Sequence, residues 1–289
     1  MHYQGTVYRP PSEAGSILLQ VTIGCSHNKC SFCGMYKGQR FSITPEEIVF
    51  ADIDYAARHF SHARRLFLCD GDALVLPQNK LQAILVRIQE RLPQINRVGI
   101  YANYKSLKAK TVEELKELRH LGLGIAYMGL ESGDDQTLAA INKGATAESM
   151  IAMAGKAKAA GIKLSVTVLL GIAGPDRSLV HAEETGRVLS AIDPEYVGAL
   201  SLMIEPQTKL YADIQAGRFV VPGPLAILGE LRAMIAATHL SGGLFHANHA
   251  SNYLPVRAKL PDEKEATLDL IDQALIGNLS LRPEFLRAL

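Results

Sequence analysis

The sequence predicts an α/β fold in which parallel strands form a curved or barrel-like sheet. Short apolar runs rich in β-branched residues alternate with longer amphipathic runs along most of the chain. Strict alternation of strands and helices requires parallel strands that are joined by crossover helices. Roughly six or seven such units fit into the 289 residues, which favours a barrel-like sheet, and an open doubly wound sheet is the second choice.

The expected strands are short apolar runs that end in glycine or in polar residues. They span residues 16–24, 65–70, 97–103, 124–131, 162–170, 196–203 and, with a weaker pattern, 243–248. In a barrel of parallel strands the functional groups gather where the carboxyl ends of the strands meet. We therefore expect the residues that directly follow each strand to form the functional site.

The expected helices begin at recognisable N-terminal signals. Thr44 and Pro45, followed by two glutamates, predict a helix with Thr44 as the N-cap and Pro45 at the first helical position. Thr111 and Glu114 have the spacing of a capping box, and that helix should end near Gly122. Further helices are expected near residues 78–92, 147–160, 178–191, 224–240 and 262–276.

The length of the chain suits one sizeable hydrophobic core, so residues 1–289 are expected to form a single domain. Its core should occupy about residues 14–210. Residues 211–289 should add a late strand and covering helices, because they are too few for a large second domain.

Charge and composition exclude several classes of partner. Lys and Arg (30) nearly balance Asp and Glu (29), so no basic surface for nucleic acid is expected. The chain has no signal-like N-terminus and no apolar run long enough to span a bilayer. With only four cysteines, most of them clustered, we expect a reducing, cytoplasmic setting and no membrane association.

Three cysteines, Cys25, Cys30 and Cys33, lie in one loop directly after the first expected strand. Three thiolates on one loop can hold three irons of a [4Fe–4S] cluster and leave the fourth iron without a protein ligand. An open coordination position is typical of catalytic metals. Zinc remains an alternative, because Cys30 and Cys33 have the spacing of half a zinc knuckle that His27 or Cys69 would complete.

Cys69 and His27 have simpler interpretations as well. Cys69 ends the second expected strand, and we interpret it as a buried thiol that binds no metal, since cysteine is often buried. His27 lies inside the cysteine loop and either shapes that loop or donates a hydrogen bond that tunes a cluster.

The cysteine loop, with Phe32 directly before the last cysteine, resembles that of the radical S-adenosylmethionine (radical SAM) superfamily. Members carry three cysteines after the first strand of a partial β/α barrel, commonly with gaps of three and then two residues. Here residues 26–29 make the first gap four residues long, which is the less common form. The resemblance implies a partial (β/α)6-type TIM-like barrel with parallel strands, plus a C-terminal covering strand and helices.

Two acidic segments resemble elements that contact S-adenosylmethionine (SAM) in this superfamily. Gly71 and Asp72 match the motif whose acid meets the methionyl ammonium, although Asp70 is a second candidate acid and a plain capped turn is the alternative. Glu131, within residues 129–144, matches the residue that contacts the ribose. That stretch resembles the branch containing oxygen-independent coproporphyrinogen oxidase, the Elongator catalytic subunits and the methylthiotransferases.

Two further segments are expected at the adenine. Gly171 and Ile172 resemble the fifth-strand element whose backbone lies against this base. Phe32 and Tyr36 could flank the same ring, and packing beneath the loop is the alternative for Phe32.

Polar residues at two other strand ends are candidates for a substrate pocket. Tyr101 and Asn103 follow the third strand, and His246, Asn248 and His249 follow the last expected strand. For the histidine-rich segment, a substrate pocket and a capped turn are equally good interpretations.

The resemblance implies an oxidoreductase with a [4Fe–4S] cluster and SAM as cofactors. Reductive cleavage of SAM would yield a 5′-deoxyadenosyl radical that abstracts hydrogen from a small or medium organic substrate, with electrons from a donor such as flavodoxin or ferredoxin. The chain has no second cysteine cluster and no basic appendage, which argues against a methylthiotransferase or a tRNA modifier. A zinc-binding protein and an electron-transfer iron–sulfur protein remain alternatives, and no catalytic side chain is assigned.

Overall fold

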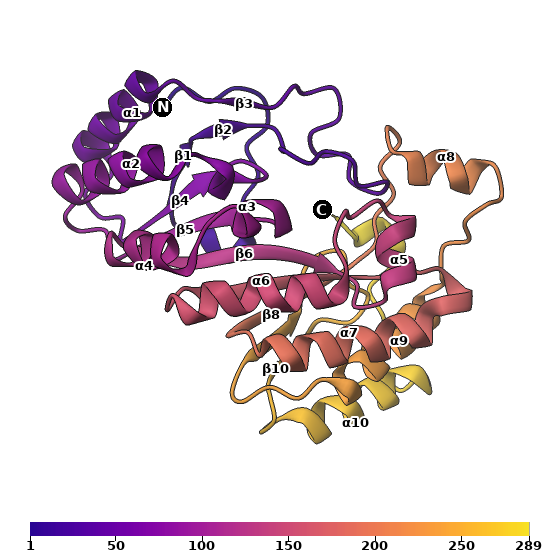
Figure 1. The fold of residues 1–289 in the computed structure, drawn as a ribbon. Coiled ribbons are helices and arrows are strands. Elements are labelled where there is room, and N and C mark those ends of the chain that lie inside the picture. The colour runs from indigo at the N-terminus through magenta and orange to yellow at the C-terminus, as the bar shows by residue number, and fades with distance from the viewer. Residues whose placement is uncertain (289) are drawn as a thin grey trace. The chain divides into compact units, whose positions relative to one another are not determined.

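The computed structural model describes residues 1–288, and its backbone contacts divide them into two compact units (Figure 1). The first unit comprises Met1–Asn28, Tyr36–Met128 and Ala152–Leu164. The second comprises Lys29–Met35, Gly129–Ile151 and the chain from Ser165 onward. The expectation of a single domain stays a prediction.

The first unit is built on parallel strands with helices between them. The strands pair in the order β1 (Ile17–Gln20), β4 (Arg65–Cys69), β5 (Arg97–Ala102) and β6 (Leu123–Glu131). The connecting helices are α1 (Glu46–His59), α2 (Gln78–Arg91), α3 (Tyr104–Lys108) and α4 (Val112–His120). Leu66, Phe67 and Leu68 are fully buried along β4, as expected for a strand that is covered on both faces.

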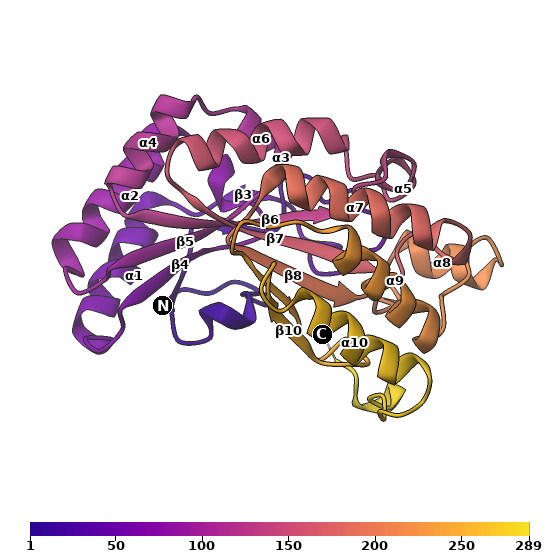
Figure 2. The same ribbon diagram turned by 90° about the horizontal axis from the view of Figure 1, so that it is seen from below.

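The second unit repeats this arrangement and ends with an antiparallel strand. β7 (Lys163–Leu170), β8 (Tyr196–Ser201) and β9 (Leu244–Ala247) are parallel, and β10 (Val256–Lys259) pairs antiparallel with β9. Three helices pack side by side, namely α7 (Ser178–Ile192), α9 (Pro224–Ala237) and α10 (Lys264–Leu275) (Figure 2). The second unit also contains α5 (Asp135–Ala140), α8 (Lys209–Gln215) and the start of α6 (Ala147–Ala159), whose residues from Ala152 onward belong to the first unit.

A glycine allows α7 and α9 to approach closely. A Cβ atom placed on Gly186 would lie 2.6 Å from the Cβ atom of Ala237, which is closer than carbon atoms pack. The two helices can therefore keep this distance only with glycine at position 186.

The expected α/β class with mostly parallel strands is confirmed, and each expected strand and helix has a counterpart. The sequence missed β10 and the short helices α3, α5 and α8, which are too short for their periodicity to be recognised. The expected strand 16–24 is divided into β1 and β2 (Thr22–Ile23), and β2 pairs with the unexpected β3 (Ser42–Ile43).

The expected N-cap of α1 is wrong by one residue. The helix begins at Glu46 with Pro45 as its N-cap, and Thr44 makes no capping hydrogen bond. Instead the Thr44 N–H donates to the carbonyl of Val21 at 3.1 Å, which extends the β2–β3 pairing. By contrast, the capping box between Thr111 and Glu114 is confirmed.

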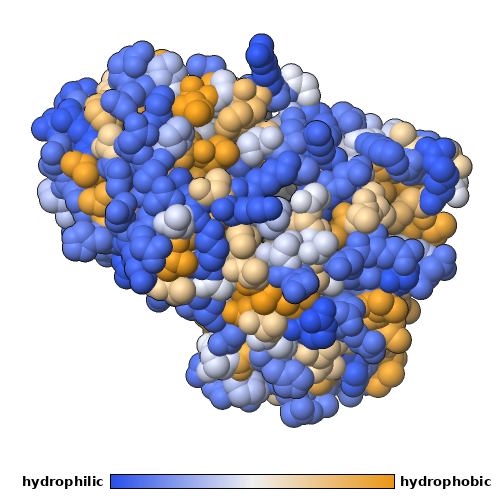
Figure 3. All heavy atoms as spheres, viewed as in Figure 1, coloured by the Kyte–Doolittle hydropathy of each residue, from blue (hydrophilic) through white to orange (hydrophobic). Residues whose placement is uncertain are grey.

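The surface agrees with the composition of the chain. The face in Figure 3 is mostly hydrophilic, with apolar residues in small separate groups. Among residues 1–288, the structure contains no helix that combines the length and the apolar character needed to cross a membrane.

Asp134 holds the start of α5. Its carboxylate accepts hydrogen bonds from the Thr137 N–H at 3.0 Å and from two nitrogens of Arg177 at 2.8 and 3.0 Å. Burial by itself would raise the pKa of Asp134, but the hydrogen bonds from Arg177 and Thr137 lower it from 3.8 to about 2. The ionised carboxylate therefore stabilises the fold at neutral pH.

We expect Asp134→Ala to lower the free energy of unfolding by about 1–2 kcal/mol at neutral pH, because the helix loses its cap. A carboxyl group whose pKa is lowered by folding stabilises above its unfolded value of 3.8, and this contribution disappears as the pH falls toward about 2. Urea unfolding at neutral pH and near pH 3 should therefore show a smaller difference between variant and parent at the lower pH. Asp269→Ala on the exposed face of α10 is the control and should change stability by about 0.5 kcal/mol or less. An Asp134→Ala effect that is equal at both pH values would contradict this role.

Candidate functional site

The cysteine loop leaves β2 beside the end of β4, within the first unit. Gly24 has φ +80°, a left-handed conformation that favours glycine, and it turns the chain toward Cys25. A Cβ atom on Gly71 would lie 2.7 Å from Cε2 of Tyr36 and 3.0 Å from Cβ of Cys25. Gly71 therefore allows the backbone after β4 to pack directly against the first cysteine.

Asp70 anchors the start of this loop. Its carboxylate accepts hydrogen bonds from Gln20 at 2.9 Å, from the Gly24 N–H at 3.3 Å and from the Tyr36 hydroxyl at 3.3 Å. Burial raises the pKa of Asp70, and these three donors lower it in part. The carboxylate of Asp70 is therefore engaged on both oxygens by the protein itself.

Asp72 differs from Asp70 in that one of its oxygens is unpaired. The side chain is fully buried, and Oδ2 accepts a hydrogen bond from the Ser26 hydroxyl. Within residues 1–288, Oδ1 is buried and has no hydrogen-bond partner. Burial raises the pKa of Asp72, and hydrogen bonds with Ser26, Ser106 and Asn103 lower it in part. A buried carboxylate oxygen without a donor is costly, so Asp72 has the capacity to bind a cationic group.

Tyr101 and Asn103, at the end of β5, both contact neighbouring parts of the protein. The Asn103 side-chain oxygen accepts hydrogen bonds from the N–H groups of Lys105 at 2.7 Å and Ser106 at 3.1 Å, which caps α3. The Tyr101 ring meets the edge of Phe67 with 4.9 Å between centroids, and burial raises the pKa of Tyr101. Their expected role at a substrate stays a prediction.

The second half of the cysteine loop is held within the second unit. The Ser31 N–H donates to the carbonyl of Ile141, and the carbonyl of Ser31 accepts from the N–H of Leu210, both at 2.9 Å. Gly34 packs so closely that a Cβ atom there would lie 2.7 Å from Nε2 of Gln207 and 2.9 Å from Cβ of Glu205. These contacts order the backbone on both sides of Phe32 and Cys33.

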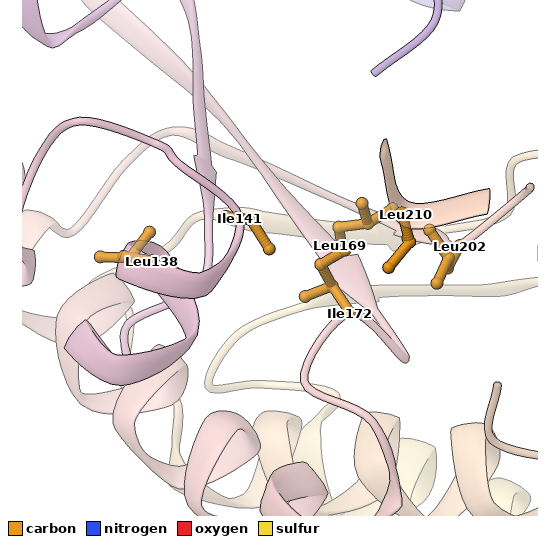
Figure 4. Close-up of a cluster of buried hydrophobic side chains, with 6 residues drawn as sticks. All are labelled: Leu138, Ile141, Leu169, Ile172, Leu202 and Leu210. Atoms are coloured by element: carbon orange, nitrogen blue, oxygen red, sulfur yellow. The ribbon is translucent and has the colours of Figure 1, made fainter. Parts of the chain in front are cut away.

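Phe32 packs against a buried apolar cluster. The cluster consists of leucine and isoleucine side chains from the end of β7, the segment after β8, and the helices α5 and α8 (Figure 4). Its members are Leu138, Ile141, Leu169, Ile172, Leu202 and Leu210. Phe32 and Ile172, both expected at the adenine, therefore belong to one apolar surface.

The Glu131 carboxylate, at the end of β6, is held between Gly129 and Lys143. A Cβ atom on Gly129 would lie 2.1 Å from Oε1 of Glu131, so the carboxylate folds back into space that only glycine leaves open. Lys143 Nζ lies 2.9 Å from the same oxygen, and both side chains are mostly buried. Glu131 also has φ +66°, a strained conformation for a residue with a side chain.

The turn that ends α5 places Lys143 beside Glu131. Asn142 adopts the left-handed conformation, and the N–H groups of Asn142 and Lys143 donate to the carbonyls of Ala139 and Leu138. This pair of bonds is a Schellman turn. The sequence analysis did not assign Lys143, although Asn-Lys-Gly after an apolar helical face is a recognisable signal for such a turn.

The β7 end is held by a buried acid. Gly171 has φ +82°, and its N–H donates to Oε1 of Glu230 at 2.7 Å. Glu230 lies on α9 and is 3% exposed. Sequence reasoning missed Glu230, because one acid in an otherwise apolar helix carries no pattern of its own.

The histidine-rich segment forms the end of β9 and the turn that follows. His246 is paired in register with Gly198 on β8 and Arg257 on β10, and its Nε2 is buried without a hydrogen-bond partner within residues 1–288. His249 Nδ1 lies 3.0 Å from the Ser251 hydroxyl, whereas Asn248 is exposed. Burial lowers the pKa of both histidines, so both are neutral near pH 7.

The cysteines differ in burial. Cys25, Cys30 and Cys33 are half-buried, Cys69 is fully buried, and none of the four forms a disulfide. Burial raises the pKa of the Cys69 thiol, which disfavours the thiolate that binds metals. His27 Nδ1 lies 3.3 Å from Lys105 Nζ. In the described part of the chain, no three Cys, His, Asp or Glu side chains stand in metal-binding positions as a group.

A family model described as the radical SAM superfamily matches residues 19–185, which is more than half of the chain. This chain belongs to the radical SAM superfamily. Members of this family generally bind a [4Fe–4S] cluster and SAM. The resemblance found in the sequence is confirmed.

Known proteins support this assignment and the fold. The radical SAM chain is 25% identical over 194 residues to the heme chaperone HemW of Bacillus subtilis, which covers 66% of this chain and 49% of HemW. Coproporphyrinogen III oxidase (HemN) from Escherichia coli has a similar structure with TM-score 0.56 and 15% identity, over 76% of this chain and 51% of that one.

The radical SAM methyltransferase TsrM from Kitasatospora setae matches with TM-score 0.58 and 17% identity, over 90% of this chain and 52% of that one. At these identities the structural matches support the fold alone, the partial TIM-like barrel. The chain spans about half the length of the curated relative.

We expect Gly71→Ala to lower the free energy of unfolding by about 1–3 kcal/mol, because the new methyl group must displace Tyr36 or Cys25. Gly155→Ala is the matched control. It lies in the middle of α6 with nothing within 4 Å of the added Cβ, and should stabilise by about 0.5–1 kcal/mol. Chemical denaturation of both variants measures the effect, and equal stability of Gly71→Ala and the parent would show that the packing at Cys25 is loose.

Proposed function

We propose that this radical SAM enzyme holds a [4Fe–4S] cluster through Cys25, Cys30 and Cys33 and cleaves SAM reductively to act on a small or medium organic substrate. The observation that carries the proposal is the environment of the first cysteine. Gly71 packs against Cys25, and the next residue, Asp72, keeps one buried carboxylate oxygen without a partner.

The donor set of the cysteine loop fits a cluster with one open iron. Three thiols in one loop supply three ligands, and the buried Cys69 is a poor fourth ligand because its pKa is raised. When bound, the cluster supplies the electron that breaks a carbon–sulfur bond of SAM and so generates the 5′-deoxyadenosyl radical. The protein's own residues bind and orient SAM and exclude water from it.

Asp72 is the better of the two acids for the methionyl ammonium. A cation beside the unpaired buried oxygen of Asp72 would stabilise its carboxylate form, whereas both oxygens of Asp70 already accept hydrogen bonds. We assign Asp72 to the amino group of SAM and Asp70 to the structure of the loop.

The second unit offers partners for the nucleoside. Glu131, held by Lys143, has a second carboxylate oxygen for the ribose hydroxyls. Gly171 and Ile172, with Phe32 on the same apolar cluster, provide backbone and apolar surface for adenine.

The candidate substrate contacts are polar side chains at the ends of β5 and β9. His246 has a buried, unpartnered Nε2 and is our first candidate for a substrate contact, ahead of Tyr101, Asn103, Asn248 and His249. The similarity to a heme chaperone and to coproporphyrinogen III oxidase makes tetrapyrroles the first compounds to test. A reductant such as flavodoxin or ferredoxin would supply electrons in a reducing compartment such as the cytoplasm, and the near-neutral charge argues against nucleic acid.

We expect the anaerobically reconstituted and reduced protein to convert SAM to 5′-deoxyadenosine and methionine, as measured by liquid chromatography and mass spectrometry. Alanine at Cys25, Cys30 or Cys33 should abolish both the cluster absorbance and the product, because each removes one of three ligands.

Cys69→Ala is the matched control and should retain iron and activity, since Cys69 is buried away from any ligand role. A brown protein that forms no 5′-deoxyadenosine with any tested substrate would favour an electron carrier. A protein that binds only zinc would overturn the proposal.

Substitutions of Asp70 and Asp72 should have different effects on SAM binding. We expect Asp72→Asn to weaken SAM binding about tenfold or more by equilibrium dialysis while the stability of the protein changes little, because only a charge toward the ligand is lost. Asp70→Asn should instead lower stability and iron content, because the new NH2 group replaces an oxygen that accepts from either Gly24 or Tyr36. The reverse pattern would exchange the two roles.

A further inference from the structure

We infer that His181 is a positioning residue that couples the Glu131 turn to the Gly171 turn, so that the two segments assigned to the nucleoside of SAM are held by one buried network of polar contacts. The inference rests on the proposed function and concerns residues of the second unit alone. His181 lies on α7 and is fully buried.

One side of the imidazole reaches the residues after Glu131. His181 Nδ1 lies 2.7 Å from the Ser132 hydroxyl, and Ser132 also accepts the N–H of Asp134 at 3.0 Å. The serine follows Glu131 directly, so its position sets where the strained backbone of Glu131 turns.

The same turn is pressed against the backbone of α7. A Cβ atom on Gly133 would lie 2.3 Å from the carbonyl oxygen of Glu184, and the Gly133 N–H donates to the Thr185 hydroxyl at 2.8 Å. The turn therefore has little freedom to move unless α7 moves with it.

The other side of the imidazole faces the acid that holds β7. His181 Nε2 lies 3.4 Å from Oε1 of Glu230 and makes no hydrogen bond within residues 1–288. The same oxygen accepts the Gly171 N–H at 2.7 Å, and the other oxygen accepts the Ser178 hydroxyl. Glu230 is therefore surrounded by donors from β7, from α7 and from the histidine.

The directions of these bonds follow from the chemistry of the groups. A carboxylate only accepts hydrogen bonds, so a proton on Nε2 of His181 faces Glu230. Nδ1 then carries a lone pair and accepts the hydroxyl proton of Ser132, whose oxygen is free to accept the Asp134 N–H. The Nε2–H tautomer therefore gives the Ser132 hydroxyl and the Asp134 N–H their acceptors and turns the remaining N–H toward the Glu230 carboxylate.

A histidine that only fills space would not need this tautomer or these partners. A network that runs from the backbone at 132–134 to the N–H of Gly171 transmits the position of one turn to the other. Removing the imidazole leaves the buried Ser132 hydroxyl without its Nδ1 acceptor and releases the spacing between the turns.

The test compares His181→Leu and His181→Gln in the full, anaerobically reconstituted protein with unreduced cluster, using SAM as the probe in equilibrium dialysis. His181→Leu should bind SAM about tenfold more weakly at unchanged iron content, and His181→Gln, which keeps one donor and one acceptor, should recover part of the loss. Val188→Ala, also buried on α7 but outside the network, is the control for general destabilisation and should bind as the parent does.

The outcomes separate the two proposals. A parent protein that binds no SAM would overturn the proposed function. A parent that binds, together with His181→Leu of equal affinity or with Val188→Ala equally weakened, would overturn the positioning role alone. Nitrogen NMR of the imidazole in the parent protein locates the ring proton of His181 and needs neither SAM nor a variant. A proton on Nδ1 would contradict the proposed network.

Discussion

Buried carboxylates that accept backbone N–H groups at the ends of strands are the constraint on which the candidate site depends. Asp70 accepts the Gly24 N–H before the cysteine loop, and Glu230 accepts the Gly171 N–H after β7. At both places the chain leaves the sheet through a glycine in the left-handed conformation, where no neighbouring strand can accept the N–H. A buried acid supplied by another segment solves the same problem in each unit.

The environments of Asp70 and Asp72 show how one short motif can serve structure and binding at once. Asp70 has all of its hydrogen bonds within the protein, whereas Asp72 retains an oxygen that the protein does not satisfy. Leaving that oxygen unpaired costs stability, which is typical of groups that are kept for a ligand. The two roles depend on which donors the fold brings to each acid and not on the acids themselves.

Close backbone packing is the second recurring device. Gly71 and Gly129 each leave space that a neighbouring functional side chain occupies, Cys25 in one case and the Glu131 carboxylate in the other. Gly133 performs the same function between the Glu131 turn and α7. A methyl group would meet Cys25 or Glu131 in the first two cases and the backbone of α7 in the third, so glycine is required for packing at all three positions.

The sequence by itself determined the α/β class, the succession of strands and long helices, and the cysteine loop with its likeness to the radical SAM superfamily. These follow from local signals, such as apolar periodicity, the capping box at Thr111 and the spacing of three cysteines. Only the tertiary structure separated Asp70 from Asp72, brought Lys143 to Glu131, and placed Glu230 and His181 beside Gly171 and Ser132. The reason is physical: a buried polar group is defined by its partner, and the partners here are far apart in the chain. Glu230 is 59 positions from Gly171, and His181 is 49 positions from Ser132.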